Sequence, residues 1–147
     1  MKNIISRMDD SMIIGWKVLS YLSLSSNEQQ KLIGQCDHNF FGDKKGKLGA
    51  NYLFGVLLMA NQYVINNFSE ELFPDTMQVN ELKSYIDILL YEKKDSTISI
   101  KDLESSNEWK RIRKLSSILL KKLKLYPIKL ERPFKIENHI EAGFYKK

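Results

Sequence analysis

The chain has 147 residues, a hydrophobic content of 43% and a formal net charge of +5 at pH 7. A chain of this length buries about two thirds of the surface of its unfolded state, so it needs no disulfide or metal to fold. The single cysteine, Cys36, has no partner for an internal disulfide, which favours a reducing compartment. The longest apolar run, 52–60, is too short to cross a bilayer, and Asp9 and Asp10 interrupt any signal peptide. We therefore expect a soluble, cytoplasmic protein.

Apolar residues recur at helical spacing in several segments, which predicts an all-α fold: a compact bundle of about five helices. The first helix is expected over 9–24. The second begins at Ser25 or Ser26, with a Ser-to-Glu or Ser-to-Gln capping box, and ends near residue 37. Glycines mark a loop at 37–49.

The third helix is expected over 48–68 and is apolar on nearly all sides, which is typical of a central helix. A fourth helix covers 77–93. The alternating segment 97–100 fits a short strand or the start of a turn. A capping box that starts at Ser105 predicts the last helix over 106–125, and a Tyr-Pro pair stops it.

Beyond the last helix the hydrophobic period changes from helical to alternating. Ile128 and Leu130 alternate with charged residues, and two further apolar residues do so after a proline. This pattern predicts a short extended tail over 126–147, either an arm laid on the bundle or a small hairpin. No internal repeat or linker divides the chain, so a single helical domain over 1–147 is expected.

The glycine- and lysine-rich segment 42–48 resembles a phosphate-binding loop but lacks two of its features. Phe41 stands where the first glycine belongs, and Leu48 replaces the Ser or Thr that holds magnesium. The overlapping segment 37–48 also lacks the oxygen ligands that a calcium loop needs at its fifth and twelfth positions. We therefore expect a solvated loop here.

The residues with nitrogen or sulfur donors for a metal are Cys36, His38 and His139. A structural zinc site needs about four such ligands, so no metal and no cofactor is expected. Local spacing brings no nucleophile beside a base. An enzyme would need a pocket that places one of these three residues next to a carboxylate, and we expect a non-enzymatic protein instead.

Charge is segregated along the chain. Residues 69–108 contain ten acidic and four basic residues, whereas 109–135 contain ten basic residues and one acidic residue. In the last helix, five cations fall within a sector of roughly 100° opposite the apolar side. We call them the basic face: Lys110, Arg113, Lys114, Lys121 and Lys124. The predicted fourth helix carries the corresponding acidic face: Glu81, Asp87 and Glu92.

Four interpretations of the basic face compete. The first is a solvated surface that the acidic helix partly neutralises, and the second is a contact for an acidic protein. The third is a nucleic-acid site, and the fourth is a membrane contact. The membrane ranks last because the apolar side of this helix has a bundle to pack on. Sparse arginine and the lack of a known nucleic-acid-binding motif in the sequence argue against nucleic acid.

We favour a non-enzymatic, protein-binding function, most specifically that of a bacterial immunity or antitoxin-type protein that neutralises a toxin by occlusion. The alternative is a small nucleic-acid-binding or regulatory protein that uses the same basic helix. Abundant Lys, Asn and Ile with few Arg are typical of an AT-rich genome, which favours a bacterial or phage origin. An acidic partner would bind the basic face and a basic nuclease toxin the acidic face; the better alignment of the cations favours the basic face.

Overall fold

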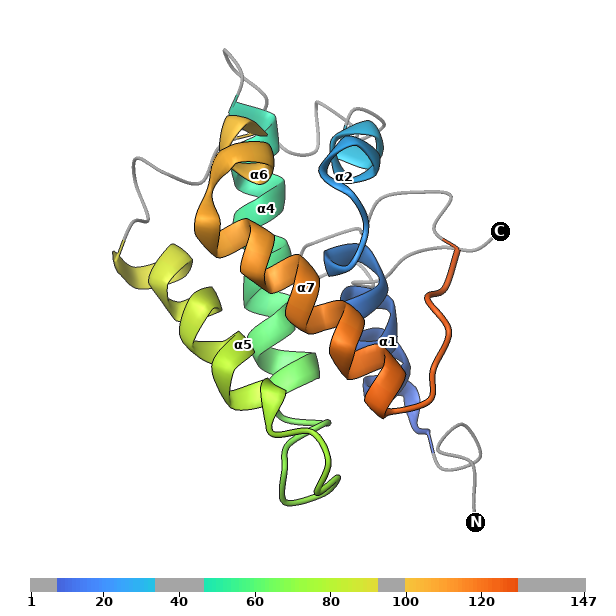
Figure 1. The fold of residues 1–147 in the computed structure, drawn as a ribbon. Coiled ribbons are helices and arrows are strands. Elements are labelled where there is room, and N and C mark those ends of the chain that lie inside the picture. Colours follow the sequence, from blue (N-terminus) through green and yellow to red (C-terminus); the bar gives the residue numbers. More distant parts are fainter. Residues whose placement is uncertain (1–7, 34–46, 93–99, 130–147) are drawn as a thin grey trace.

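The computed structural model describes residues 8–33, 47–92 and 100–129. Within these ranges the chain is helical without any strand, and its helices pack around a hydrophobic core (Figure 1). The α-helices are α1 (Asp10–Leu22), α2 (Ser26–Ile33), α4 (Lys47–Met59), α5 (Gln78–Asp87), α6 (Ile100–Ser105) and α7 (Asn107–Lys122). The all-α bundle predicted from the sequence is thereby confirmed.

Capping motifs begin α1 and α2, and the one before α2 is the capping box predicted at Ser25. Asp9 caps α1 by accepting a hydrogen bond from the Met12 amide at 2.8 Å. At the start of α2, Ser25 Oγ accepts from the Glu28 amide at 3.2 Å, and Glu28 Oε1 accepts in turn from the Ser25 amide at 3.3 Å. Both motifs supply acceptors to N–H groups that the first turn of a helix leaves without a partner.

The region before α7 differs from the prediction. Ser106 rather than Ser105 is the N-cap, since its Oγ accepts from the Trp109 amide at 3.1 Å. Ser105 instead ends α6, an additional helix of six residues. Ile100, which the sequence places in a strand or turn, is the first residue of α6, and the rest of that alternating segment lies outside the described residues. A helix this short leaves too few apolar positions for helical periodicity to be recognised.

The predicted third and fourth helices both continue beyond their α-helical part as a π-helical turn. α4 leads into η2 (Ala60–Ile65) and α5 into η3 (Ile88–Glu92). α4 with η2 is less completely buried than expected of a central helix that is apolar on nearly all sides. Phe54 and Leu58 on α4 are 38% and 43% exposed. Its other apolar side chains, from Leu53 to Val64, supply much of the core.

α1 and η2 approach each other closely at Gly15. This glycine is buried, and a Cβ atom there would overlap the carbonyl oxygen of Tyr63 in η2 and press on the ring of Phe68. Only the absence of a side chain lets the two helical backbones pack at this distance. The contact therefore depends on glycine for space and not for a special backbone angle.

α7 lies between α5 and α1, as Figure 1 shows, and contacts both of them as well as α6. Its buried side matches the apolar side predicted from the sequence: Trp109, Ile112, Leu115, Leu119, Leu120 and Leu123. Burial of these side chains removes apolar surface from water and fixes the rotation of α7 about its own axis. The opposite side of the helix is consequently left to solvent.

α7 ends at Lys122, before the predicted end at residue 125, in a Schellman motif. The Lys124 amide donates to the Lys121 carbonyl at 3.0 Å, and the Leu125 amide donates to the Leu120 carbonyl at 2.9 Å. Lys124 has a φ of 60°, in the left-handed region that favours glycine. Leu125 then returns to the core, where it is 5% exposed.

After α7 the described residues 126–129 form neither helix nor strand. The remainder of the predicted tail lies outside the described residues, as do Cys36, His38, His139 and most of the glycine-rich loop. Across the described ranges, none of the helices combines the length and the apolar character that crossing a membrane requires.

Replacing Gly15 by alanine is expected to lower the free energy of unfolding by about 2 kcal/mol, because the new methyl group meets backbone atoms of η2 that cannot move aside alone. Urea unfolding followed by circular dichroism measures the change. Ser117→Ala, at an exposed position of α7, is the matched control and should change stability by less than about 0.5 kcal/mol. Equal effects of the two substitutions would contradict the close approach.

Replacing Lys124 by glycine is expected to raise the free energy of unfolding by about 0.5–1 kcal/mol, because glycine adopts the left-handed conformation without the steric cost of a Cβ. The same substitution at Lys110, within α7, should instead lower it by about 1 kcal/mol. Thermal unfolding of both variants checks the opposite signs. A destabilised Lys124→Gly protein would show that the Schellman motif does not limit stability here.

Candidate functional site

The exposed side of α7 carries three lysines of the predicted basic face, and we call Lys110, Lys114 and Lys121 the lysine row. All three are exposed, as is Ser117 between them. The helical repeat places these four positions within a sector of roughly 60°, and the three lysine Cα atoms extend over about 16 Å along the axis. The lysine row therefore lies opposite the buried leucines of the same helix.

The charges of the lysine row are not neutralised within the described part of the chain. Two ion pairs there join Lys83 to Asp87 and Arg111 to Glu81, and neither involves the row. Three ammonium groups in line, on a helix fixed by its buried side, create a local positive potential.

Arg113, the fourth member of the basic face, is directed toward the protein itself. It is partly buried, and its Nη1 donates to Gln29 Oε1 at 3.2 Å. Gln29 is fully buried, and its Nε2 donates to the carbonyl oxygens of Tyr21 and Leu22 at the end of α1, at 3.0 and 3.3 Å. Burial lowers the pKa of Arg113 below its ordinary value. Arg113 thus connects α7 to the α1–α2 corner, and little of it is left for a partner.

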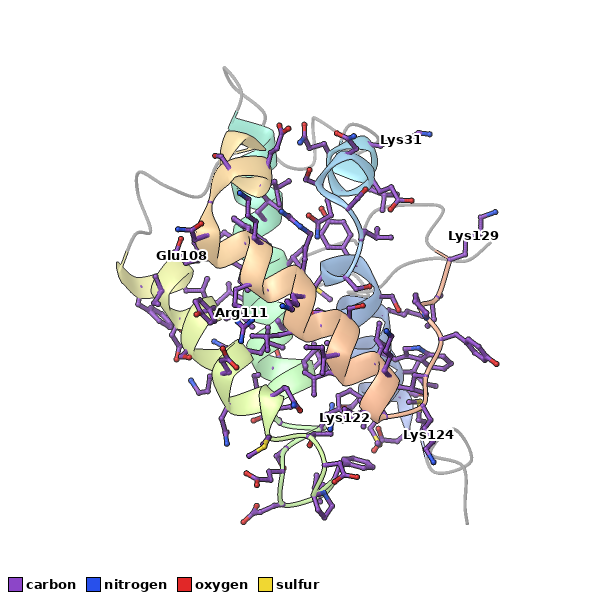
Figure 2. The ribbon with its side chains drawn as sticks, in the orientation of Figure 1. Lys31, Glu108, Arg111, Lys122, Lys124 and Lys129 are labelled. Atoms are coloured by element: carbon purple, nitrogen blue, oxygen red, sulfur yellow. The ribbon has the colours of Figure 1, made fainter. Side chains whose placement is uncertain are left out.

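Lys124, the fifth member, is exposed but lies beyond the end of α7 in the Schellman turn. Figure 2 shows it close to Lys122 at this end of the helix, with Lys129 farther along the segment that follows. All three side chains are exposed. The positive surface therefore extends past the helix, although its last members are positioned by a turn and an extended segment.

One member of the predicted acidic face, Glu81, contacts α7 directly. Arg111 reaches from α7 toward α5 in Figure 2, where its Nε and Nη2 donate to Glu81 Oε2 at 2.9 and 2.7 Å. The hydrogen bond to Glu81 and the charge of this carboxylate raise the pKa of Arg111. Arg111, which is not a member of the basic face, thus links α7 to α5.

Asp87 also has partners within the protein. Its Oδ2 accepts from Lys83 Nζ at 2.7 Å, and its Oδ1 accepts from Asn61 Nδ2 at 3.3 Å. Glu92 is part of η3, and its side chain is outside the described residues. Both described carboxylates of the acidic face are consequently engaged by groups of the same chain.

The described residues form no cluster of metal ligands. Among them, no three His, Cys, Asp or Glu side chains gather closely enough to hold an ion. Cys36, His38 and His139, the three candidates from the sequence, lie outside that part of the chain.

Two features of this surface are not evident from the sequence. Arg111 lies about 100° around the helix from Lys110, which separates it from the basic face but does not show that Glu81 is its partner. Tyr126 belongs to the Tyr-Pro pair that stops the last helix, yet its side chain is also 79% exposed beside the last lysines of the chain's basic segment. A helical projection places residues on α7 but says nothing about a residue beyond its end.

Comparison with models of known protein families, with curated proteins and with solved structures finds no match for this chain. Any inference about function therefore depends on the chain's own residues.

Arg113 and Lys114 are neighbours in sequence but are expected to differ in their contribution to stability. Arg113→Ala removes a partly buried side chain and leaves Gln29 Oε1 without its donor, which should lower the free energy of unfolding by about 1–2 kcal/mol. Lys114→Ala, on the exposed side, should change it by less than about 0.5 kcal/mol. Urea unfolding of both variants makes the comparison.

A double-mutant cycle identifies the contact responsible for that difference. Gln29→Ala and Arg113→Ala together should cost less than the sum of the two single changes, by about 0.5 kcal/mol or more, because both remove the same hydrogen bond. Strict additivity would show that Arg113 acts on stability through another contact.

Proposed function

We propose that this chain is a non-enzymatic, protein-binding protein and that the lysine row on α7 is its docking surface for an acidic partner. The observation that supports this is the difference between the two charged surfaces. The row's three ammonium groups have no carboxylate partner within the described part of the chain, whereas Glu81 and Asp87 are both engaged internally. A row of such cations accelerates association with an acidic surface and selects against basic ones.

The engaged carboxylates argue against the opposite arrangement, in which a basic partner binds the acidic face. Such a partner would have to displace Arg111 from Glu81 and Lys83 from Asp87 before it gained contacts of its own. Both displacements leave a cation without its partner. An acidic protein that binds the lysine row disrupts no described ion pair.

An immunity or antitoxin-type role in bacteria is the specific form of this proposal. A protein that neutralises a toxin by occlusion needs a stable scaffold and one complementary surface, and no chemistry of its own. The buried side of α7 supplies the first requirement, because it fixes the helix against α1 and α5. The lysine row on the exposed side of α7 is proposed as the complementary surface. Its partner would be a toxin that presents carboxylates.

A nucleic-acid partner is the second candidate, since exposed lysines also suit a phosphate backbone. The two arginines of α7 count against it. Arg111 is paired with Glu81 and Arg113 with Gln29, so the guanidinium groups that would read guanine in two-point contacts are not on the exposed side. Lysines alone support contacts that do not depend on base sequence.

Reversing the charge of the row, by Lys110→Glu, Lys114→Glu and Lys121→Glu together, is expected to weaken partner binding by about 10- to 100-fold, because attraction across the interface becomes repulsion. A photo-crosslinker at residue 117, in the middle of the row, first captures the partner in cells of the source organism, and mass spectrometry identifies it. Calorimetry with the purified partner then measures binding, and co-expression tests whether the chain relieves the partner's toxicity.

Two comparisons make this test decisive. Lys121→Glu alone is matched by Lys31→Glu on α2, which changes the net charge equally but lies far from the last turn of α7 (Figure 2); only the former should weaken binding. A protein partner should lose modest affinity between about 50 and 200 mM salt, whereas a nucleic acid should lose orders of magnitude. Binding that survives reversal of the whole row would refute the docking surface.

A further inference from the structure

The segment that follows α7 is attached to α1 by two hydrogen bonds from successive turns of that helix. Trp16 Nε1 donates to the carbonyl oxygen of Tyr126 at 2.7 Å, and Ser20 Oγ accepts from the Ile128 amide at 2.8 Å. Just before them, Leu125 is buried in the core. The backbone is thus fixed on both sides of Tyr126.

Neither hydrogen bond involves the side chain of Tyr126. It is 79% exposed, more than any other exposed large hydrophobic side chain of the described residues. A tyrosine on a fixed backbone has only two side-chain torsions to lose when it binds, and its ring brings a large contact area. Tyrosine is for that reason one of the residues in which binding free energy concentrates at protein interfaces.

Exposed lysines lie before and after Tyr126 in the sequence. Lys121, Lys124 and Lys129 are all exposed. Figure 2 shows Lys124 near the end of α7 and Lys129 farther along the segment that follows, and Tyr126 lies between these two lysines in the sequence. The remaining exposed apolar residues lie on α4, on η3 and in the connection that precedes α5: Phe54, Leu58, Leu72, Met77 and Tyr91.

We propose that Tyr126 is the anchor of the partner-binding surface, and that its ring enters an apolar pocket of an acidic protein whose carboxylates face the exposed lysines of α7 and of the segment after it. This inference rests on the proposed function and extends the docking surface from the lysine row to the segment beyond α7. The lysines provide attraction at a distance, and the ring provides the apolar area that slows dissociation.

The arrangement fits a protein better than a nucleic acid. Single strands are held by several aromatic side chains on which successive bases stack. Among the described residues, Tyr126 is the one exposed aromatic residue that accompanies these lysines; Phe54 and Tyr91 lie on other elements. One exposed ring with exposed lysines on both sides of it in the sequence fits the pattern of an interface anchor with polar contacts about it.

A phage-displayed library of random peptides, selected on the full chain, tests the inference even while the natural partner is unidentified. We expect selected peptides to be rich in Asp and Glu around an apolar position. Tyr126→Ala should weaken their binding by about tenfold or more, and Tyr126→Phe, which retains the ring, by much less. Tyr91→Ala is the control and should leave binding unchanged. Tyr91 is 62% exposed and belongs to η3, which continues α5 on the left in Figure 1, whereas the segment after α7 lies on the right.

The outcomes separate this inference from the proposed function. Peptides that lose affinity on reversal of the lysine row but not on Tyr126→Ala would refute the anchor alone. Peptides that depend on Tyr126 but tolerate reversal of the row would refute the row as docking surface. Failure to enrich acidic peptides, or tighter binding of a fluorescent single-stranded oligonucleotide that Tyr126→Ala abolishes, would overturn the assignment to an acidic protein.

Discussion

Burial of one side of α7 against α5 and α1 is the constraint on which the rest of this structure depends. Six apolar side chains, from Trp109 to Leu123, are removed from water by this packing, and their number leaves the helix a single favourable rotation about its axis. That rotation decides the role of each cation on α7. Lysines opposite the leucines face solvent, and the two arginines at the flanks meet groups of neighbouring helices.

The arginines show how the protein uses part of its own charge. Arg111 pairs with Glu81 across the α5–α7 contact, and Arg113 donates to the buried Gln29, which in turn holds the last carbonyl groups of α1. A planar guanidinium group with several fixed donors suits such positions between helices better than a flexible ammonium group does. Within the described residues, the exposed positive surface is therefore made of lysine. It has fewer cations than the basic face predicted from the sequence, and no described carboxylate pairs with the lysine row.

Much of the local structure could be predicted from the sequence because its causes are local. The Asp9 cap and the Ser25–Glu28 capping box involve residues three apart, and the leucines of α7 share one side through helical periodicity alone. Such local rules failed where two serines compete to be the cap of α7 and where α6 is too short to show a period. They also placed Arg113 on the outer surface, since a projection of one helix contains no neighbouring helix.

The sequence by itself determined the fold class, most helix starts and the presence of lysines along one side of the last helix, because capping and periodicity act over one or two turns. Only the tertiary structure decided that Glu81 and Asp87 are engaged within the chain, that Gly15 lets α1 and η2 approach, and that Tyr126 is fixed yet exposed. These outcomes join residues far apart in sequence, such as Trp16 with Tyr126 and Glu81 with Arg111. Such pairs form only when helices pack, and packing is a property of the whole core and not of any single segment.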